Sequence, residues 1–131
     1  FRLPTEAEWE YACRDGGRQQ TFSGGFTHWE VSQSRDQNIS ASRPVGLLQP
    51  NRLGLYDMSG NMWEWVMDVE AADAYSLHDR MNPLVTSGGD YYVVRSGSWA
   101  DASGDTRCGE RGSWPPASGD SDLSFRLIKL P

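Results

Sequence analysis

Residues 54–66, GLYDMSGNMWEWV, place three polar side chains inside an apolar run. Asp57, Asn61 and Glu64 stand among two tryptophans, a tyrosine and two methionines. Calcium binds about six to eight oxygen atoms, from carboxylates and from backbone carbonyls, and it suits irregular loops. One interpretation is therefore a calcium site with Asp57 and Glu64 as its charged ligands.

The other interpretation needs no metal. Asp57 and Asn61 would hold turns through hydrogen bonds from backbone groups to their side chains. Glu64 would form an ion pair with an arginine such as Arg95 or Arg126. The spacing leaves both interpretations open, because the run does not follow the EF-hand pattern.

Composition indicates one acidic, globular domain over residues 1–131. The chain has a formal net charge of −6 and 37% hydrophobic residues, and a chain of this length buries roughly two-thirds of its unfolded surface. The acidic balance disfavours nucleic acid as a partner, because binding to phosphates requires lysine and arginine. No apolar stretch approaches the ~20 residues of a membrane span. Oligomeric state and localisation stay open; surface display, a virion and secretion all fit the sequence.

The clearest predicted element is a helix within residues 3–17, LPTEAEWEYACRDGG. Thr5 and Glu8 form a capping box, in which each side chain accepts a hydrogen bond from the backbone N–H of the other residue. Trp9 and Cys13 stand four positions apart, so we expect one side of this helix to pack inward.

Two later stretches have the residue pattern of strands. YYVVRSGSW (91–99) is rich in aromatic and β-branched residues, and LSFRLIKL (123–130) alternates. We expect the two to pair in one sheet, and residues 61–67 to form a short strand or a helical turn. Most of the remaining chain is polar and aperiodic. The predicted fold class is therefore α+β, with one helix, a small antiparallel sheet and long loops.

Cys13 and Cys108 are the only cysteines. Two cysteines do not make a disulfide framework, and neither lies in a zinc-binding pattern. Buried free thiols are the favoured interpretation. A single bridge from the first helix to the C-terminal region is the alternative.

Five separated blocks resemble the formylglycine-generating enzyme (sulfatase-modifying factor) family in order and spacing. They are RLPTEAEWEYACR (2–14), NRLGLYDMSGNMWEWVMD (51–68), VVRSGSW (93–99), RCGER (107–111) and SFRL (124–127). The resemblance implies a variant of the C-type lectin fold, with a small twisted antiparallel sheet, a helix and long loops. It also implies structural calcium at Asp57, Gly60, Met62 and Glu64.

The resemblance further implies an enzymatic activity, the oxidation of a substrate cysteine to formylglycine by a copper-binding cysteine pair. Cys108 matches the second cysteine of that pair, but Ser103 stands where the first belongs. One thiolate cannot form the two-sulfur site that copper(I) prefers. We therefore expect no catalytic residues. An enzyme or enzyme domain of the family acting through Cys108 is the alternative.

Residues 100–122 have an unusual composition: 15 of the 23 are Asp, Ser, Gly or Ala, and none is Asn. In the family this stretch is commonly rich in asparagine. Asparagine codons yield these four residues when their adenines are replaced, which is how diversity-generating retroelements mutate their targets. The variable proteins of such retroelements resemble this chain.

The resemblance thus predicts a variable segment over about residues 95–127, on a non-catalytic protein that binds a protein or glycan ligand. Loop positions that face solvent tolerate substitution, and aromatic anchors amid Ser, Gly and Asp are typical of antibody paratopes. A flexible loop without a binding role is the alternative. The predicted ligand-binding positions are Ala100, Asp101, Ser103, Gly104, Asp105, Gly109, Gly112, Ser113, Trp114, Ser118, Gly119, Asp120, Ser121 and Asp122.

Overall fold

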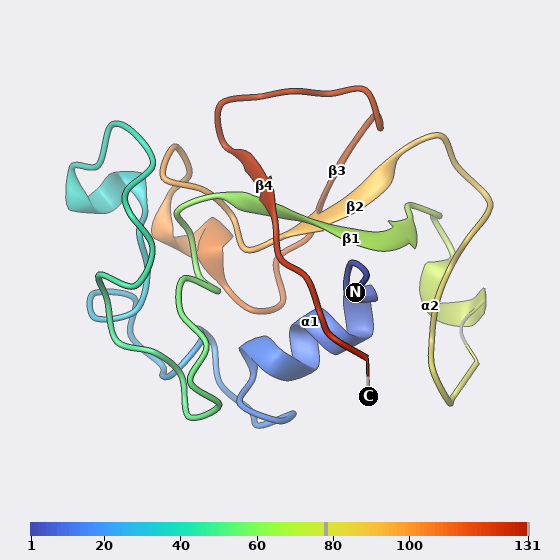
Figure 1. The fold of residues 1–131 in the computed structure, drawn as a ribbon, viewed down its shortest axis with the longest axis horizontal. Coiled ribbons are helices and arrows are strands. Elements are labelled where there is room, and N and C mark those ends of the chain that lie inside the picture. Colours follow the sequence, from blue (N-terminus) through green and yellow to red (C-terminus); the bar gives the residue numbers. More distant parts are fainter. Residues whose placement is uncertain (78, 131) are drawn as a thin grey trace.

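The computed structural model describes residues 1–77 and 79–130 (Figure 1). Short elements are joined by long loops. In chain order they are α1 (Glu6–Cys13), the 3-10 turn η1 (Arg35–Gln37), β1 (Trp63–Val69), α2 (Ala74–Leu77), β2 (Tyr92–Arg95), the 3-10 turn η2 (Ser103–Thr106), β3 (Gly112–Trp114) and β4 (Leu123–Phe125).

The four strands form one mixed sheet in the order β3-β2-β1-β4. β1 pairs antiparallel with β2, and β2 with β3, but β4 runs parallel to β1. The prediction of an antiparallel sheet is therefore wrong for β4, the strand at one edge. Residues 91–99 and 123–130 do contribute strands to one sheet, but β1 lies between them, so they do not pair directly. The segment after β3 arches over the sheet and brings the chain back to the opposite edge, as Figure 1 shows in red.

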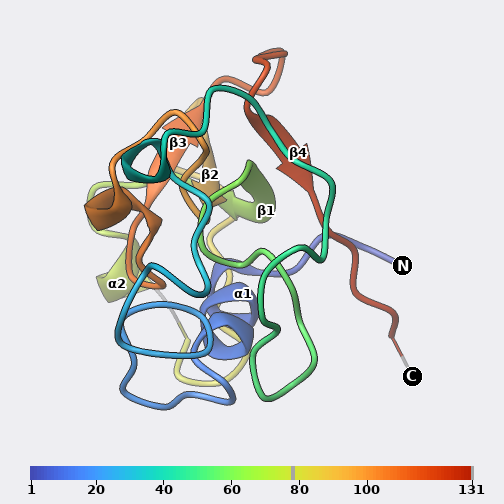
Figure 2. The same ribbon diagram turned by 90° about the vertical axis from the view of Figure 1, so that its left-hand side faces the viewer.

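The capping box predicted for α1 is confirmed. The Thr5 side chain accepts a hydrogen bond from the Glu8 backbone N–H, and the Glu8 carboxylate accepts one from the Thr5 N–H. Trp9 and Cys13 are both buried on the inner side of the helix. α1 lies under the sheet, and the loops between α1 and β1 gather at one end of it, toward the viewer in Figure 2.

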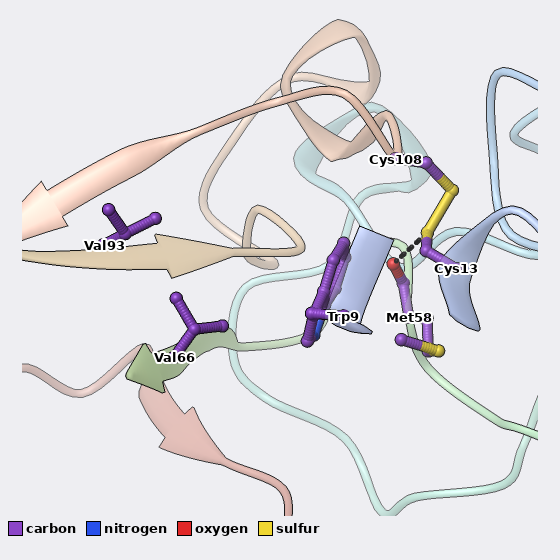
Figure 3. Packing of buried hydrophobic residues seen from close by; sticks show 6 residues of the cluster. All are labelled: Trp9, Cys13, Met58, Val66, Val93 and Cys108. Atoms are coloured by element: carbon purple, nitrogen blue, oxygen red, sulfur yellow. Dashed lines mark hydrogen bonds between the residues drawn. A yellow bond between two sulfur atoms is a disulfide. The ribbon is translucent and has the colours of Figure 1, made fainter. Parts of the chain in front are cut away.

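The core between α1 and the sheet contains a disulfide bond (Figure 3). Trp9, Met58, Val66 and Val93 pack there with the two cysteines. Cys13 and Cys108 are bonded, with their Cα atoms 5.7 Å apart and 95 positions between them in the sequence. The favoured interpretation of free thiols is therefore wrong, and the bridge ties α1 to the segment before β3.

The two faces of the sheet differ in what they carry. Val66 and Val93 point into the core against α1. Trp65 and Phe125 are register partners, as are Tyr92 and Trp114, and register partners lie on the same face. These four aromatic residues form the face opposite α1, called the aromatic face below. Phe125 and Tyr92 expose 61% and 38% of their surface there.

Candidate functional site

Asp57 holds two neighbouring loops. Its Oδ1 accepts a hydrogen bond of 2.7 Å from the Gln33 side chain, and its Oδ2 accepts one of 2.7 Å from the backbone N–H of Gly46. Both carboxylate oxygens therefore bind protein groups. Asp57 itself has a positive φ of 56°, a conformation that Asp adopts more readily than most residues.

Asn61 and Gly60 hold the next turn. The Asn61 side chain accepts from the Arg43 N–H at 2.9 Å and donates to the Arg43 carbonyl at 3.2 Å. Gly60 has a φ of +82°, and a Cβ there would lie 2.1 Å from the Gln33 carbonyl oxygen. Only glycine fits this position, because both the conformation and the close approach exclude a side chain.

Glu64 forms a two-point ion pair with Arg126. The Arg126 Nε and Nη2 donate to the two Glu64 oxygens at 2.6 and 2.7 Å, and the Trp9 Nε1 donates to Glu64 at 2.7 Å. Burial acts to lower the Arg126 pKa, but the hydrogen bonds and negative charge of Glu64 outweigh it and raise that pKa. This is the arginine pairing that the sequence offered as the alternative to a metal.

Three of the four predicted calcium ligands already bind protein groups in this arrangement. The carboxylate oxygens of Asp57 and Glu64 all bind protein donors, and the Gly60 carbonyl accepts two hydrogen bonds. Among the described residues, no group of three or more His, Cys, Asp or Glu is placed to hold a metal. Calcium at Asp57, Gly60, Met62 and Glu64 stays a prediction, and a calcium ion there would compete with Arg126 for the Glu64 carboxylate.

The predicted ligand-binding positions avoid the core. None of the 14 is buried, although Thr106 and Cys108, which stand among them, are fully buried. The exposed ones are Gly104, Asp105, Gly109, Gly119, Asp120 and Ser121, and the half-buried ones are Ala100, Asp101, Ser103, Gly112, Ser113, Trp114, Ser118 and Asp122.

The first part of the predicted variable segment is held largely through its backbone. The N–H of Ser103 donates to the Asp36 carboxylate at 2.8 Å, and the carbonyl of Asp101 accepts from the Arg35 N–H at 2.9 Å. These contacts fix residues 101–103 to η1. Both hydrogen bonds use main-chain atoms of the segment, so most other side chains at these positions would leave them in place.

The later part is anchored in the same way. The Cys108 N–H donates to the Thr21 carbonyl at 2.8 Å, and the Asp122 carbonyl accepts from the Trp63 N–H at 2.8 Å. Between these points, β3 pairs with β2 through its backbone. Main-chain hydrogen bonds therefore fix both the start and the end of the arch over the sheet.

Asp101 and Ser113, both predicted to bind ligand, use their side chains in hydrogen bonds within the protein. The Asp101 carboxylate accepts hydrogen bonds from the N–H and the hydroxyl of Ser98, at 2.9 and 2.8 Å. The Ser113 hydroxyl donates to Glu70 at 2.6 Å. Asp101 thus closes its own turn, and it is the less suitable of the two for substitution.

The structure brings some of these positions together and separates others, such as Ser103 at η1 and Gly109 at the end of α1. Trp114 packs on Trp63 with ring centroids 5.6 Å apart, and Asp122 bonds the Trp63 backbone, so these positions meet at the start of β1. Gly112 lies there too, since a Cβ on it would be 3.3 Å from the Trp63 ring. Gly109 instead lies beside the Arg14 guanidinium, at the end of α1.

A buried charge network links α1 to the predicted variable segment. Arg95 is fully buried and donates to Glu6 at 2.8 Å and to Glu10 at 2.7 Å. Arg111 adds two hydrogen bonds to Glu6, at 2.7 and 3.1 Å. The sequence did not predict this network, and it indicated Arg95 as one possible partner of Glu64. The available signal was the spacing of Glu6 and Glu10, one helical turn apart.

Comparison with known proteins shows the family of the chain. The family model for the sulfatase-modifying factor enzyme 1-like domain matches residues 1–130. The chain belongs to this family. It is 37% identical over 131 residues to the serine/threonine-protein kinase pkn1 of Chlamydia pneumoniae, covering 98% of this chain and 21% of the kinase. It is 34% identical over 112 residues to the formylglycine-generating enzyme of Mus musculus, covering 75% of this chain and 30% of the enzyme.

A solved structure supports the same assignment. Treponema denticola variable protein 1 superposes with a TM-score of 0.82 and 36% sequence identity, over 95% of this chain and 45% of that one. The fold is the α+β, C-type lectin-like fold of the sulfatase-modifying factor enzyme 1-like family. The chain spans less than half the length of each of these three proteins.

Within this family, Cys108 was expected to match an active-site cysteine. Its sulfur is bonded to Cys13, so it carries no free thiol in this structure. Ser103, at the position expected for the partner cysteine, is the first residue of η2. The described part of the chain contains no helix long and apolar enough to cross a membrane.

Proposed function

We propose that this chain is a non-catalytic, ligand-binding member of its family, with a hypervariable surface diversified by a retroelement. The observation that carries the proposal is the contrast between side chain and backbone in residues 100–122. None of the 14 predicted ligand-binding positions is buried, six being exposed and eight half-buried, whereas the backbone around them bonds to η1, Thr21 and β1. Exposed side chains on a fixed backbone tolerate exchange at little cost in stability.

The aromatic face supports the proposed binding role. Trp114 lies there next to Tyr92, at the foot of the arch that contains Ser118–Asp122. Rigid aromatic rings supply contact area at a low cost in conformational entropy, while Ser, Gly and Asp adapt to the ligand. A protein or glycan surface is the class of ligand that such a mixture suits.

The similarity to Treponema denticola variable protein 1 favours this proposal, and the similarity to formylglycine-generating enzymes favours an enzyme acting through Cys108. The disulfide weighs against the enzyme, because a thiolate is the species that reacts and binds metals. Cys108 would first have to be released from Cys13, and it is fully buried.

Sequencing the gene from independent isolates tests the proposal. We expect differences concentrated in codons 95–127, and a near-copy of this stretch nearby that differs only at adenines, beside a reverse transcriptase gene. An invariant segment next to a sulfatase gene would contradict the proposal. A direct assay complements this: incubation with a cysteine-containing sulfatase peptide is expected to yield no aldehyde.

A further inference from the structure

An open pocket of about 490 Å³ lies away from the aromatic face, beside the disulfide. It is bounded by the end of α1, the loop that follows α1 and the residues around Cys108. Its lining includes Arg14, Arg107, Thr21, Phe26 and Gly109. Two guanidinium groups in one pocket are notable on a chain whose formal net charge is −6.

Both arginines keep N–H groups available. Arg14 donates from Nε to Glu10 at 2.7 Å and from Nη1 to the Gln20 carbonyl at 2.7 Å, and its Nη2 makes no hydrogen bond to the described residues. Arg107 donates from Nη2 to Glu110 at 2.8 Å, and its Nε and Nη1 have no acceptor there. The bonds to Glu10 and Gln20 fix the Arg14 guanidinium in place, so little entropy is lost when a ligand binds it.

Gly109 leaves the approach to Arg14 open. A Cβ at this position would lie 3.1 Å from the Arg14 Nη2, so any larger residue would contact the guanidinium. Glu110 is the carboxylate in the pocket, and it pairs with Arg107. The side chain of Phe26, 72% exposed, adds an apolar wall. A ligand here meets an aromatic ring and two cations, each of which is paired with one glutamate and keeps further N–H groups.

We propose that this pocket binds a carboxylate group of the ligand, presented by an acidic peptide segment, with Arg14 and Arg107 as its donors. Guanidinium groups match carboxylates in geometry and form charge-assisted hydrogen bonds with them. The residue at position 109 sets the specificity, because an acidic side chain there would occupy Arg14 itself. The inference rests on the proposed function in one respect: position 109 is among those proposed to vary.

Isothermal titration with a hexaglutamate peptide at low ionic strength tests the pocket, with hexaglutamine as the neutral probe and glutarate as the free small acid. We expect hexaglutamate to bind and hexaglutamine not to bind. Arg14→Gln and Arg107→Gln are each expected to weaken binding about tenfold, the usual effect of losing one charge-assisted hydrogen bond. Arg52→Gln, a change of an exposed arginine outside the pocket, is the matched control. Glutarate binding as tightly as hexaglutamate would support the carboxylate site and identify a free acid as the ligand.

Gly109→Asp and Gly109→Asn separate charge from size. The aspartate is expected to abolish hexaglutamate binding by pairing with Arg14, and the equally large asparagine to retain it. These variants leave both arginines and their structural bonds in place, so they test the site even if Arg14→Gln unfolds. No binding of either acid, or unchanged binding in all four variants of Arg14, Arg107 and Gly109, would overturn the proposal. The sequencing test of the proposed function has a separate readout, so the two failures are distinguishable.

Discussion

The Asp36 carboxylate accepts a 2.8 Å hydrogen bond from the backbone N–H of Ser103, 67 positions later in the chain. The bond holds the start of η2 against η1, and hydrogen bonds from the Ser103 side chain and from its backbone N–H keep the Asp36 pKa below its ordinary value. We expect Asp36→Ala to raise the hydrogen-exchange rate of the Ser103 amide severalfold. Ser103→Ala keeps the N–H and is expected to leave the exchange slow. Equal rates in the two variants would mean that Asp36 does not hold this turn.

Acid is expected to weaken the cap of α1. The hydrogen bonds from Arg2 lower the Glu8 pKa from 4.5 to about 2. A carboxyl group whose pKa is lower in the folded state stabilises the fold above the unfolded pKa, and loses that contribution as pH falls through the folded one. The contribution of Glu8 to the free energy of unfolding is therefore lost between pH 4.5 and about 2. Because Glu8 is 43% exposed, the contribution is at most ~1 kcal/mol.

Urea unfolding at several pH values measures this effect. Glu8→Gln keeps an oxygen to accept the Thr5 N–H but carries no charge, so its unfolding free energy should change less between pH 4.5 and 2. Parallel pH profiles for the two proteins would show that Glu8 does not contribute.

Reduction of the Cys13–Cys108 bond is expected to destabilise the fold. The bond joins residues 95 positions apart, and closing so long a loop restricts the unfolded chain. Removing such a disulfide costs about 2–5 kcal/mol. Urea unfolding with and without dithiothreitol measures the loss, and a double variant with alanine at both positions should not respond to the reductant. Two free thiols in the unreduced protein would contradict the structure.

Replacing Arg95 should cost more than replacing a surface arginine. Arg95→Met leaves the buried carboxylate of Glu6 with Arg111 as its remaining partner. Breaking a buried ion pair costs about 3–5 kcal/mol, whereas surface changes stay within about 0.5 kcal/mol. Arg52→Met, at an exposed position, is the matched control. Equal melting temperatures for the two variants would show that the network contributes little.

Chelation tests the calcium prediction. The pairing of Glu64 with Arg126 argues against calcium, and without bound calcium we expect EDTA to leave the melting temperature of the protein unchanged. Glu64→Gln should lower it, with or without added calcium, since it weakens a buried pair. If EDTA lowers the melting temperature of the natural chain but not that of Glu64→Gln, calcium binds at this position.

Local features of the fold were predictable from the sequence, and long-range ones were not. The capping box of Thr5 and Glu8 depends on neighbours three positions apart, so its residues specify it. The direction of β4 depends on the path of the arch over the sheet, which no local pattern encodes. Likewise, spacing did not distinguish a Cys13–Cys108 bond from two free thiols.

The partner of Glu64 shows why the candidate site was only partly predictable. From the sequence, the partner of the Glu64 carboxylate could be a metal ion or an arginine, and neither composition nor spacing decided between them. The parallel register of β1 and β4 pairs Glu64 with Ser124. Arg126 follows two positions later on the same face, within reach of the carboxylate. Strand register, which appears only in the fold, selected Arg126.

The bond from Ser103 to Asp36 also limits which sequences the segment accepts. It needs an amide hydrogen and no particular side chain, and proline is the one standard residue without that hydrogen. At position 103 of a repertoire, proline variants would therefore lose this main-chain hydrogen bond, and every other residue would keep the N–H that makes it.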